Sequence, residues 1–551
     1  MTATTPQKKR LSKAEGESAP VSPNQPRKRL SVCATTSSQN PAGKAPRLSS
    51  LEKCSPEHVG LDPLSLEDHR ERNRWQSTLG ILPGVAECVL AGNRVAYMDL
   101  MGCADVEHGT PVVPTTLYRC FSMTKPLTAV ALARLVEDKQ VSWDDAVSKY
   151  IPSFRSMRVV KREYAKEWGK IADPDRVEQA KRPITLRHLL THTSGLAYGP
   201  DRVSPKVPLK ASSPEESSYL DLVQAVDEGR ITSLEVFCDT LAKLPLRFHP
   251  GERWMYSHGV DVVGRVIEVV SGKSLDTFLR EDLCQPLGMS NTKFFVGRDR
   301  AQALAAMYLA KKGRSRNCLE RVDGDSPEES RWFGRNRRVL AGGGIMGSCA
   351  GGVVSCLHDM TMFVGMLSNR GLTLGGRRFL KSSTVQALSK DWLELNSVVG
   401  HRFGRSKPLR GWPFGAQIGW NPLGHVRRRD GCMYMGGWST NWAIWPKTRL
   451  ATISMSQSLV YFDIPGWVAR RDELDSAVEF GVAQHRRRLA MRRRHSAAQA
   501  EKLKRCSQTT SGRSAQTKAL LQKLHKQVLG SGRRSPTKKQ SKEAAKRGGR
   551  R

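Results

Sequence analysis

The chain has 551 residues, a length that allows two or three domains of average size or one large fold. It carries 89 Lys and Arg residues against 52 Asp and Glu residues, a formal net charge of +37. No stretch approaches the roughly 18 to 20 apolar residues that a membrane-spanning helix needs, so the composition argues against a transmembrane protein and indicates anionic partners or a solvated basic surface.

The positive charge lies mainly at the two ends. Residues 1–50 hold nine basic and two acidic residues, and residues 485–551 hold 22 and two. The N-terminal tail, residues 1–53, is rich in Ser, Thr, Pro and Ala without an apolar run, which predicts disorder and no secretory signal. The twelve cysteines are scattered and form no C-x-x-C pair. We therefore expect an intracellular protein, cytoplasmic or nuclear, that is not secreted.

Strand-like runs separated by turn signals predict two β-hairpins in the body of the chain. Residues 85–90 and 94–98 form the first pair of strands, with a Gly-Asn turn signal between them. Residues 441–445 and 450–456 form the second pair. Residues 467–484 follow and suggest a closing helix. Periodicity alone thus predicts a mixture of α and β structure.

Residues 121–140 have the composition of a helix, because they are rich in Ala and Leu and place Pro126 near the start. In such a helix Ser122 and Lys125 would lie on the same face. A serine becomes a good nucleophile when a base takes its proton, and a lysine can be that base if burial and nearby dipoles lower its pKa. The S-x-x-K spacing alone is a weak signal, since it recurs twice in polar segments of this chain.

Other patterns fail as functional motifs. His188 and His192 stand four residues apart, as zinc ligands often do, but no H-E-x-x-H surrounds them, so packing or hydrogen bonding is favoured. Cys349 and Cys356 are best explained as small core residues. Ser194 lacks the G-x-S-x-G turn of α/β-hydrolases. We expect neither a metal nor a cofactor.

Six blocks of sequence, in a fixed order between residues 58 and 457, resemble one family. They begin at Leu82, Thr116, Thr185, Leu244, Pro286 and Gly351. Together they resemble the serine β-lactamase-like family, in particular its branch of class C β-lactamases, family VIII carboxylesterases and transesterases, with penicillin-binding proteins as further relatives. The resemblance implies an α/β (α+β) fold, in which an antiparallel sheet flanked by helices lies beside a mainly helical lobe. It covers residues 54–484, between disordered basic tails.

The family pattern implies a role for Tyr256 in Tyr256-Ser257-His258, where members carry Y-x-N or Y-S-x. A tyrosine at this position relays a proton to the leaving group. His258 stands where β-lactamases and penicillin-binding proteins have an asparagine that helps to hold the amide side chain of the antibiotic. That difference argues against β-lactam hydrolysis and leaves ester or amide chemistry unaffected.

The third family motif is K-T-G, H-x-G or W-G-G, on a strand that lines the pocket. Its match here is Met435-Gly436-Gly437-Trp438. The resemblance implies that the backbone N–H groups of Ser122 and Trp438 form an oxyanion hole, and the two glycines would let a substrate approach the backbone closely. Met435 departs from the pattern, because it offers neither a cation nor an indole.

We therefore expect a serine hydrolase or acyltransferase that forms an acyl-enzyme on Ser122, with Lys125 as base and Tyr256 as proton relay. Its substrates would be small esters or amides. Two alternatives stay open: a catalytically silent scaffold that binds through its basic tails, and a true β-lactamase or D-aminopeptidase.

The C-terminal tail, residues 485–551, is expected to be disordered or partly helical. Its charge predicts nonspecific contact with nucleic acid or an anionic surface, unless it is only a solvated tail. The oligomeric state is not predicted.

Overall fold

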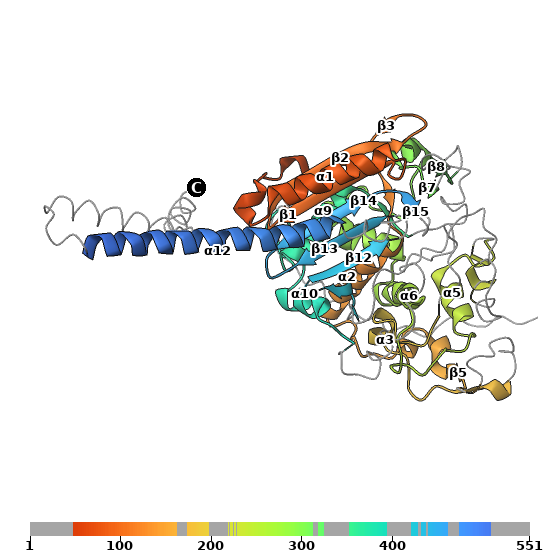
Figure 1. Cartoon of the computed structure of the whole chain (residues 1–551). Coiled ribbons are helices and arrows are strands. Elements are labelled where there is room, and N and C mark those ends of the chain that lie inside the picture. Colours follow the sequence, from red (N-terminus) through yellow and green to blue (C-terminus); the bar gives the residue numbers. More distant parts are fainter. Residues whose placement is uncertain are drawn as a thin grey trace, which may run out of the picture. The chain divides into compact units, whose positions relative to one another are not determined.

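The computed structural model describes residues 48–161, 163, 174–197, 219, 221–223, 225–226, 229–311, 318–323, 352–393, 420–427, 431–436, 439–460 and 473–508 (Figure 1). The chain divides into two compact units, Met1–Lys44 and Ala45–Arg551, and every described residue belongs to the second. Among these residues, no helix combines the length and the apolar composition that crossing a bilayer requires.

The described strands form one large antiparallel sheet of eight strands, in the order β10-β11-β12-β13-β14-β1-β2-β3. Both predicted hairpins are confirmed, as β1–β2 and β13–β14. β1 and β14 also pair with each other, so the first and last long strands of the fold are neighbours. The strands are β1 (Gly84–Ala91), β2 (Arg94–Asp105), β3 (Thr110–Pro111), β10 (Trp420–Asn421), β11 (Gly424–Arg427), β12 (Gly431–Gly436), β13 (Thr440–Trp445) and β14 (Leu450–Met455).

Three small sheets accompany the large one. The pair β4–β9 matters most for the site, because β4 leads directly into the turn that carries Ser122. The members of these sheets are β4 (Tyr118–Arg119) with β9 (Val354–Ser355), β5 (Arg158–Val160) with β6 (Val177–Gln179), and β7 (Tyr308–Lys311) with β8 (Cys318–Arg321) and β15 (Ser458–Val460).

Side chains of the large sheet alternate between two apolar clusters, as strand geometry requires. On one face, Val89 and Ala443 pack with Leu66 of α1 and Leu474 of α12. On the other face, residues such as Cys88 join the main core together with α2 and α9. Figure 1 shows α1 and α12 running next to each other along the sheet. The helices that cover the two faces are α1 (Pro63–Thr78) and α12 (Glu473–Gln508), and α2 (Thr124–Glu137) and α9 (Leu357–Ser368).

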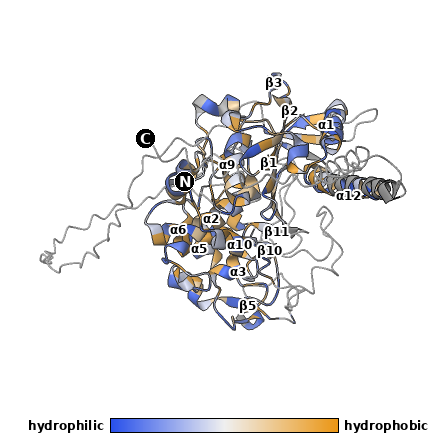
Figure 2. Ribbon diagram, turned by 90° about the vertical axis from the view of Figure 1, so that its left-hand side faces the viewer, coloured by the Kyte–Doolittle hydropathy of each residue, from blue (hydrophilic) through white to orange (hydrophobic). Residues whose placement is uncertain are grey.

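A mainly helical lobe continues the core beyond α2. Its central helix, α6, buries Val262, Val263, Val266 and Ile267 on one side, while the Arg265 side chain is partly exposed to solvent. The hydropathy colours of Figure 2 show both kinds of residue along this helix. The described helices of the lobe are α3 (Leu186–Leu190), α5 (Leu234–Leu241), α6 (Gly259–Ser271), α7 (Leu275–Phe278), the π-helical turn η8 (Leu279–Cys284) and α8 (Gln285–Leu287), and α10 (Ser382–Ser389) lies later in the chain.

The two ends of the described chain correct the expectations about the tails. Residues 48–53 were expected to be disordered, but Leu48 and Leu51 are buried in the core and the N–H of Val95 donates to the Glu52 carbonyl. The closing helix was expected to end near residue 484, and α12 instead continues to Gln508. The first part of α12 is anchored, since Leu474 and Val478 are buried. From Arg487 on, most side chains that the structure describes are exposed.

Candidate active site

Ser122 lies on a tight turn between the small β4–β9 sheet and α2. The turn is η3 (Phe121–Met123), so the predicted helix is confirmed from Thr124 on and its first residues are 3₁₀-helical instead. The N–H of Cys120 donates to the Val353 carbonyl at 2.9 Å. Phe121 has a φ of +47°, which a bulky residue rarely adopts, so the surrounding contacts must hold the turn in shape. The side chain of Ser122 sits in the interior, with the residue 4% exposed.

Two predicted residues, Lys125 and Tyr256, converge on the Ser122 hydroxyl. The Lys125 Nζ lies 3.2 Å from the Ser122 Oγ, and the Tyr256 hydroxyl lies 2.9 Å from the same oxygen. Lys125 is 1% exposed, and its Nζ is 4.7 Å from the centroid of the Tyr256 ring. A nucleophile with two proton-carrying groups in hydrogen-bond reach is the arrangement that covalent catalysis requires.

Tyr256 comes from an irregular segment that precedes α6, at the point where α6 crosses α3. Gly259 permits this crossing, because a Cβ there would lie 2.7 Å from the Leu189 carbonyl oxygen. His192, just beyond α3, stacks on Tyr256 with ring centroids 4.5 Å apart. The sequence patterns missed this contact, and nothing in the spacing of the two residues could have revealed it.

The other histidine of the pair has a separate partner. His188 closes a capping box at the start of α3: its N–H donates to the Thr185 hydroxyl, and its Nδ1 accepts from the Thr185 N–H, each at 3.2 Å. Burial, with a further contribution from Arg182, lowers the pKa of His188 to about 4. Hydrogen bonding and packing thus explain both histidines, as the sequence analysis favoured over a metal site.

His258 does not belong to the group around Ser122, contrary to its assignment as a substrate-binding residue. Its imidazole is fully buried in the helical lobe and lies 3.0 Å from the Asp261 carboxylate. It packs edge-on against Phe237, with centroids 5.4 Å apart, and parallel to Tyr219. The ring therefore turns into the start of α6 and occupies a structural position there.

Met435, which the family motif also suggests for substrate binding, lies in a different apolar cluster from the main core. It is 8% exposed and packs in the cluster that α1 and α12 cover, whereas its neighbour Tyr434 faces the main core. Strand alternation then directs Gly436 toward the nucleophile turn, where a Cβ would lie well inside contact distance of the Cys120 carbonyl oxygen. The close neighbour of Gly436 is therefore the protein's own backbone. Gly437 and Trp438 lie outside the described residues.

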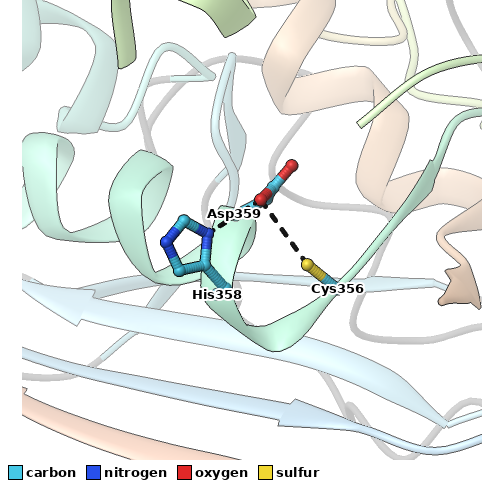
Figure 3. A group of neighbouring side chains, drawn as sticks. All are labelled: Cys356, His358 and Asp359. Carbon is cyan, nitrogen blue, oxygen red and sulfur yellow. Dashed lines mark hydrogen bonds and ion pairs between the residues drawn. The ribbon is translucent and has the colours of Figure 1, made fainter. Parts of the chain in front are cut away.

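A group of potential metal ligands occurs at the start of α9, where Cys356, His358 and Asp359 lie side by side (Figure 3). Asp359 already accepts hydrogen bonds from the Asn291 N–H at 2.7 Å and the Thr292 hydroxyl at 2.9 Å, and its other oxygen lies 2.9 Å from the His358 Nδ1. Burial and the neighbouring carboxylate raise the pKa of the Cys356 thiol well above its ordinary value. A carboxylate whose oxygens already accept several hydrogen bonds is a poor metal ligand, and the group instead ties the Asn291 and Thr292 loop to α9.

Comparisons with known proteins identify the fold. The Beta-lactamase family model matches residues 73–473. Esterase EstB of Burkholderia gladioli is 32% identical over 213 residues, which cover 39% of this chain and 47% of EstB. Monacolin J acid methylbutanoyltransferase of Aspergillus terreus is 26% identical over 365 residues, 63% of this chain and 78% of that enzyme. The solved structure of unliganded simvastatin synthase from Aspergillus terreus matches with a TM-score of 0.59 and 22% identity, over 76% of this chain and 98% of that one.

The fold and the family expected from the six sequence blocks are both confirmed. The antiparallel sheet flanked by helices and the helical lobe beside it are present, and the structural match covers three quarters of the chain. The family model spans the segments that carry Ser122, Lys125 and Tyr256. The chain belongs to the Beta-lactamase family and is a serine hydrolase, with esterases and acyltransferases among its relatives.

Proposed function

We propose that the protein forms an acyl-enzyme on Ser122 and passes the acyl group of a small ester or amide to water or to an alcohol. The observation that carries this proposal is the convergence of the Lys125 Nζ and the Tyr256 hydroxyl on the Ser122 Oγ, at 3.2 and 2.9 Å. These distances are within the range for direct proton transfer. The two groups approach a single buried hydroxyl from different elements, α2 and the segment before α6.

In the proposed acylation, the Ser122 Oγ attacks the carbonyl carbon of the substrate while Lys125 takes the hydroxyl proton. The new C–O bond gives a tetrahedral intermediate. Its collapse breaks the bond to the leaving group, which receives a proton through Tyr256. Deacylation repeats the steps in reverse, with water or an alcohol as the attacking group and Ser122 as the leaving group. The scheme has no step that needs a metal or a cofactor.

Developing charge on the carbonyl oxygen needs hydrogen-bond donors. We assign this role to the backbone N–H groups of Ser122 and Trp438, and we assign Gly436, where β12 ends, and Gly437 to substrate binding. Such a pair of donors stabilises the transition state by several kcal/mol, on the order of 3 kcal/mol for each donor. Gly436, at the end of β12, lies against the carbonyl of Cys120, which is two positions before Ser122 in the chain. This close approach supports the assignment.

Esters are the preferred substrates in this proposal. Two relatives are named an esterase and a methylbutanoyltransferase, names that describe the cleavage of an ester and the transfer of an acyl group. His258 occupies the position at which β-lactamases present an asparagine amide, and its ring is buried against Asp261. This position therefore offers no side-chain amide for the acylamino group of an antibiotic.

We assign the catalytic domain to residues 54–484 and propose an intracellular location, cytoplasmic or nuclear. The eight cysteines whose side chains the structure describes are free thiols and most are buried, as suits a reducing compartment. The part of α12 from residue 485 to 508 carries nine Lys and Arg residues against one Glu. It has too few apolar residues for the apolar face of a membrane-surface helix, so we propose contact with a polyanion such as nucleic acid.

The first test is covalent labelling with a fluorophosphonate, which reacts with activated serines. We expect one labelled site, at Ser122, and no labelling in Ser122→Ala. Ser194→Ala serves as the matched control, because Ser194 is a buried serine of the helical lobe whose hydroxyl accepts a hydrogen bond from the Leu196 N–H. Undiminished labelling of Ser122→Ala would place the nucleophile at another residue.

A further inference from the structure

We propose that His192 is a positioning residue that holds Tyr256 against the nucleophile. The inference rests on the proposed role of Tyr256 as proton relay and adds the group that keeps the phenol in place. His192 follows α3, and Tyr256 precedes α6, so the contact joins two parts of the lobe. The residue is 1% exposed, which leaves it no direct access to a substrate.

Several contacts connect His192 with the segment around Tyr256, among them a 3.3 Å approach of its Nδ1 to the Ser257 hydroxyl. Its backbone carbonyl accepts from the N–H of Met255, the residue before Tyr256, at 2.9 Å. Its Nδ1 accepts from the N–H of Ser257, the residue after Tyr256, at 3.3 Å. Its ring lies against the phenol itself, with centroids 4.5 Å apart and planes tilted by 39°. One residue therefore fixes the backbone on both sides of Tyr256 and the ring between them.

The surroundings explain why Tyr256 needs such support. The segment from Glu252 to Ser257 is neither helix nor strand, so its N–H groups find partners outside regular structure. The Trp254 ring packs edge-on against the His192 ring, with centroids 5.8 Å apart. His192 has a φ of +56°, in the left-handed region that residues other than Gly adopt uncommonly, with Asn, Asp and His the most frequent exceptions.

The hydrogen bonds of His192 also indicate that it does not exchange protons with Ser122. A backbone N–H can only donate, so the Nδ1 that accepts from Ser257 carries no proton, and in the neutral ring the proton is on Nε2. The contact is thus made by the neutral imidazole as an acceptor. His192 acts through the position of Tyr256, and the Ser122 hydroxyl exchanges protons with Lys125 and Tyr256 alone in the proposed mechanism.

The decisive experiment is a double-mutant cycle on turnover of p-nitrophenyl butyrate. His192→Ala is expected to lower kcat about tenfold to a hundredfold, the range for a catalytic group displaced by about 1 Å, with KM changed less than twofold. Tyr256→Phe with His192→Ala should be no slower than Tyr256→Phe alone, because a positioning residue has nothing left to position. A loss of the same factor in both backgrounds would show that His192 acts independently of Tyr256 and would overturn the proposal.

Two further variants separate the contacts and guard against misfolding. His192→Asn keeps an acceptor near the Nδ1 position and tolerates positive φ, so it should recover part of the lost kcat and remains folded for the cycle if His192→Ala does not. His188→Gln, four residues earlier, should leave kcat unchanged at neutral pH. Full turnover by a folded His192→Ala protein would refute the inference. Full turnover by Tyr256→Phe would instead refute the proposed function, so the two failures are distinguishable.

Discussion

Gly436→Ala tests whether the end of β12 sets the position of the nucleophile. A methyl group at this position would overlap the carbonyl oxygen of Cys120 and the hydroxyl of Thr440, well inside the 3.0 Å below which real Cβ contacts are essentially absent. The Thr440 side chain can rotate away, but the Cys120 carbonyl is part of the backbone two residues before Ser122. The strand and the turn must therefore separate.

The size of the effect follows from that separation. A shift on the order of 1 Å at Ser122 is enough to cost about a hundredfold in rate when reacting groups lose their alignment. We expect kcat for p-nitrophenyl butyrate to fall about tenfold to a hundredfold in Gly436→Ala. Overpacking of this kind also costs about 1–3 kcal/mol of folding stability, so a loss of activity has to be separated from a loss of folded protein.

Gly431→Ala is the matched control, because it makes the same change at the other end of the same strand. A Cβ at Gly431 would lie 2.9 Å from ring atoms of Trp445 and away from the nucleophile turn. It should lower the melting temperature by a similar amount and leave kcat nearly unchanged. Wild-type kcat in a folded Gly436→Ala protein, or equal losses of kcat in both variants, would refute the reasoning.

Four further outcomes follow from the structure. Lys125→Ala and Tyr256→Phe should each lower ester turnover about a hundredfold or more, and the double variant should be little slower than either, because the groups act as a unit. p-Nitrophenyl acetate or butyrate should be hydrolysed while a chromogenic cephalosporin is not, and comparable efficiencies would contradict the substrate argument. The folded-state pKa of His188, about 4, lies below its ordinary value of 6.5, so the unfolded chain binds the extra proton and stability falls as the pH drops from 6.5 to 4. His188→Gln should flatten this part of the plot of unfolding free energy against pH. The change should be less than about 3 kcal/mol, because water reaches part of the ring. A chain truncated after residue 484 should keep ester turnover and lose salt-sensitive retention on heparin, and inactivity of the folded truncated chain would extend the catalytic domain into 485–508.

Local patterns predicted the parts of this protein that local geometry determines. Strand-forming runs on either side of a turn signal identified both hairpins, since a hairpin joins neighbouring segments of the chain. The Ser122 and Lys125 pair depends only on helical spacing, and the two side chains meet even though the first residues form a 3₁₀ turn. Tyr256 stands 134 positions from Ser122, and only the family resemblance connected the two.

Motif matches did not determine which way a side chain faces. Met435 occupies a family position, but the pairing of β12 with β13 puts Met435 opposite Asn441 and turns its side chain toward α12. His258 stands in the motif after Tyr256, but it also directly precedes α6, where Asp261 gives it a buried partner. In both cases a long-range or helix-terminal constraint determined the orientation.

Composition also misplaced the ends of the folded region. Polar and basic residues around Leu48 and Leu51 indicated a solvated tail, but two buried leucines are enough to attach this segment beside β2. At the other end, the Arg, Ala and Leu residues after 484 are good helix formers, so α12 continues without a core to cover it. Charge predicts which residues meet water, and it does not predict where a helix ends.

The geometry of the candidate site depends on two close approaches between backbones. Gly436 brings β12 against the Cys120 carbonyl, and Gly259 brings α6 against the Leu189 carbonyl at 2.7 Å. The first fixes the turn that carries the nucleophile, and the second fixes the helix that follows Tyr256. Because neither approach leaves room for a methyl group, we expect a substitution at either glycine to disturb the 2.9 Å hydrogen bond between the phenol and the nucleophile. Substitutions at these positions should therefore appear in kcat, in addition to their effect on stability.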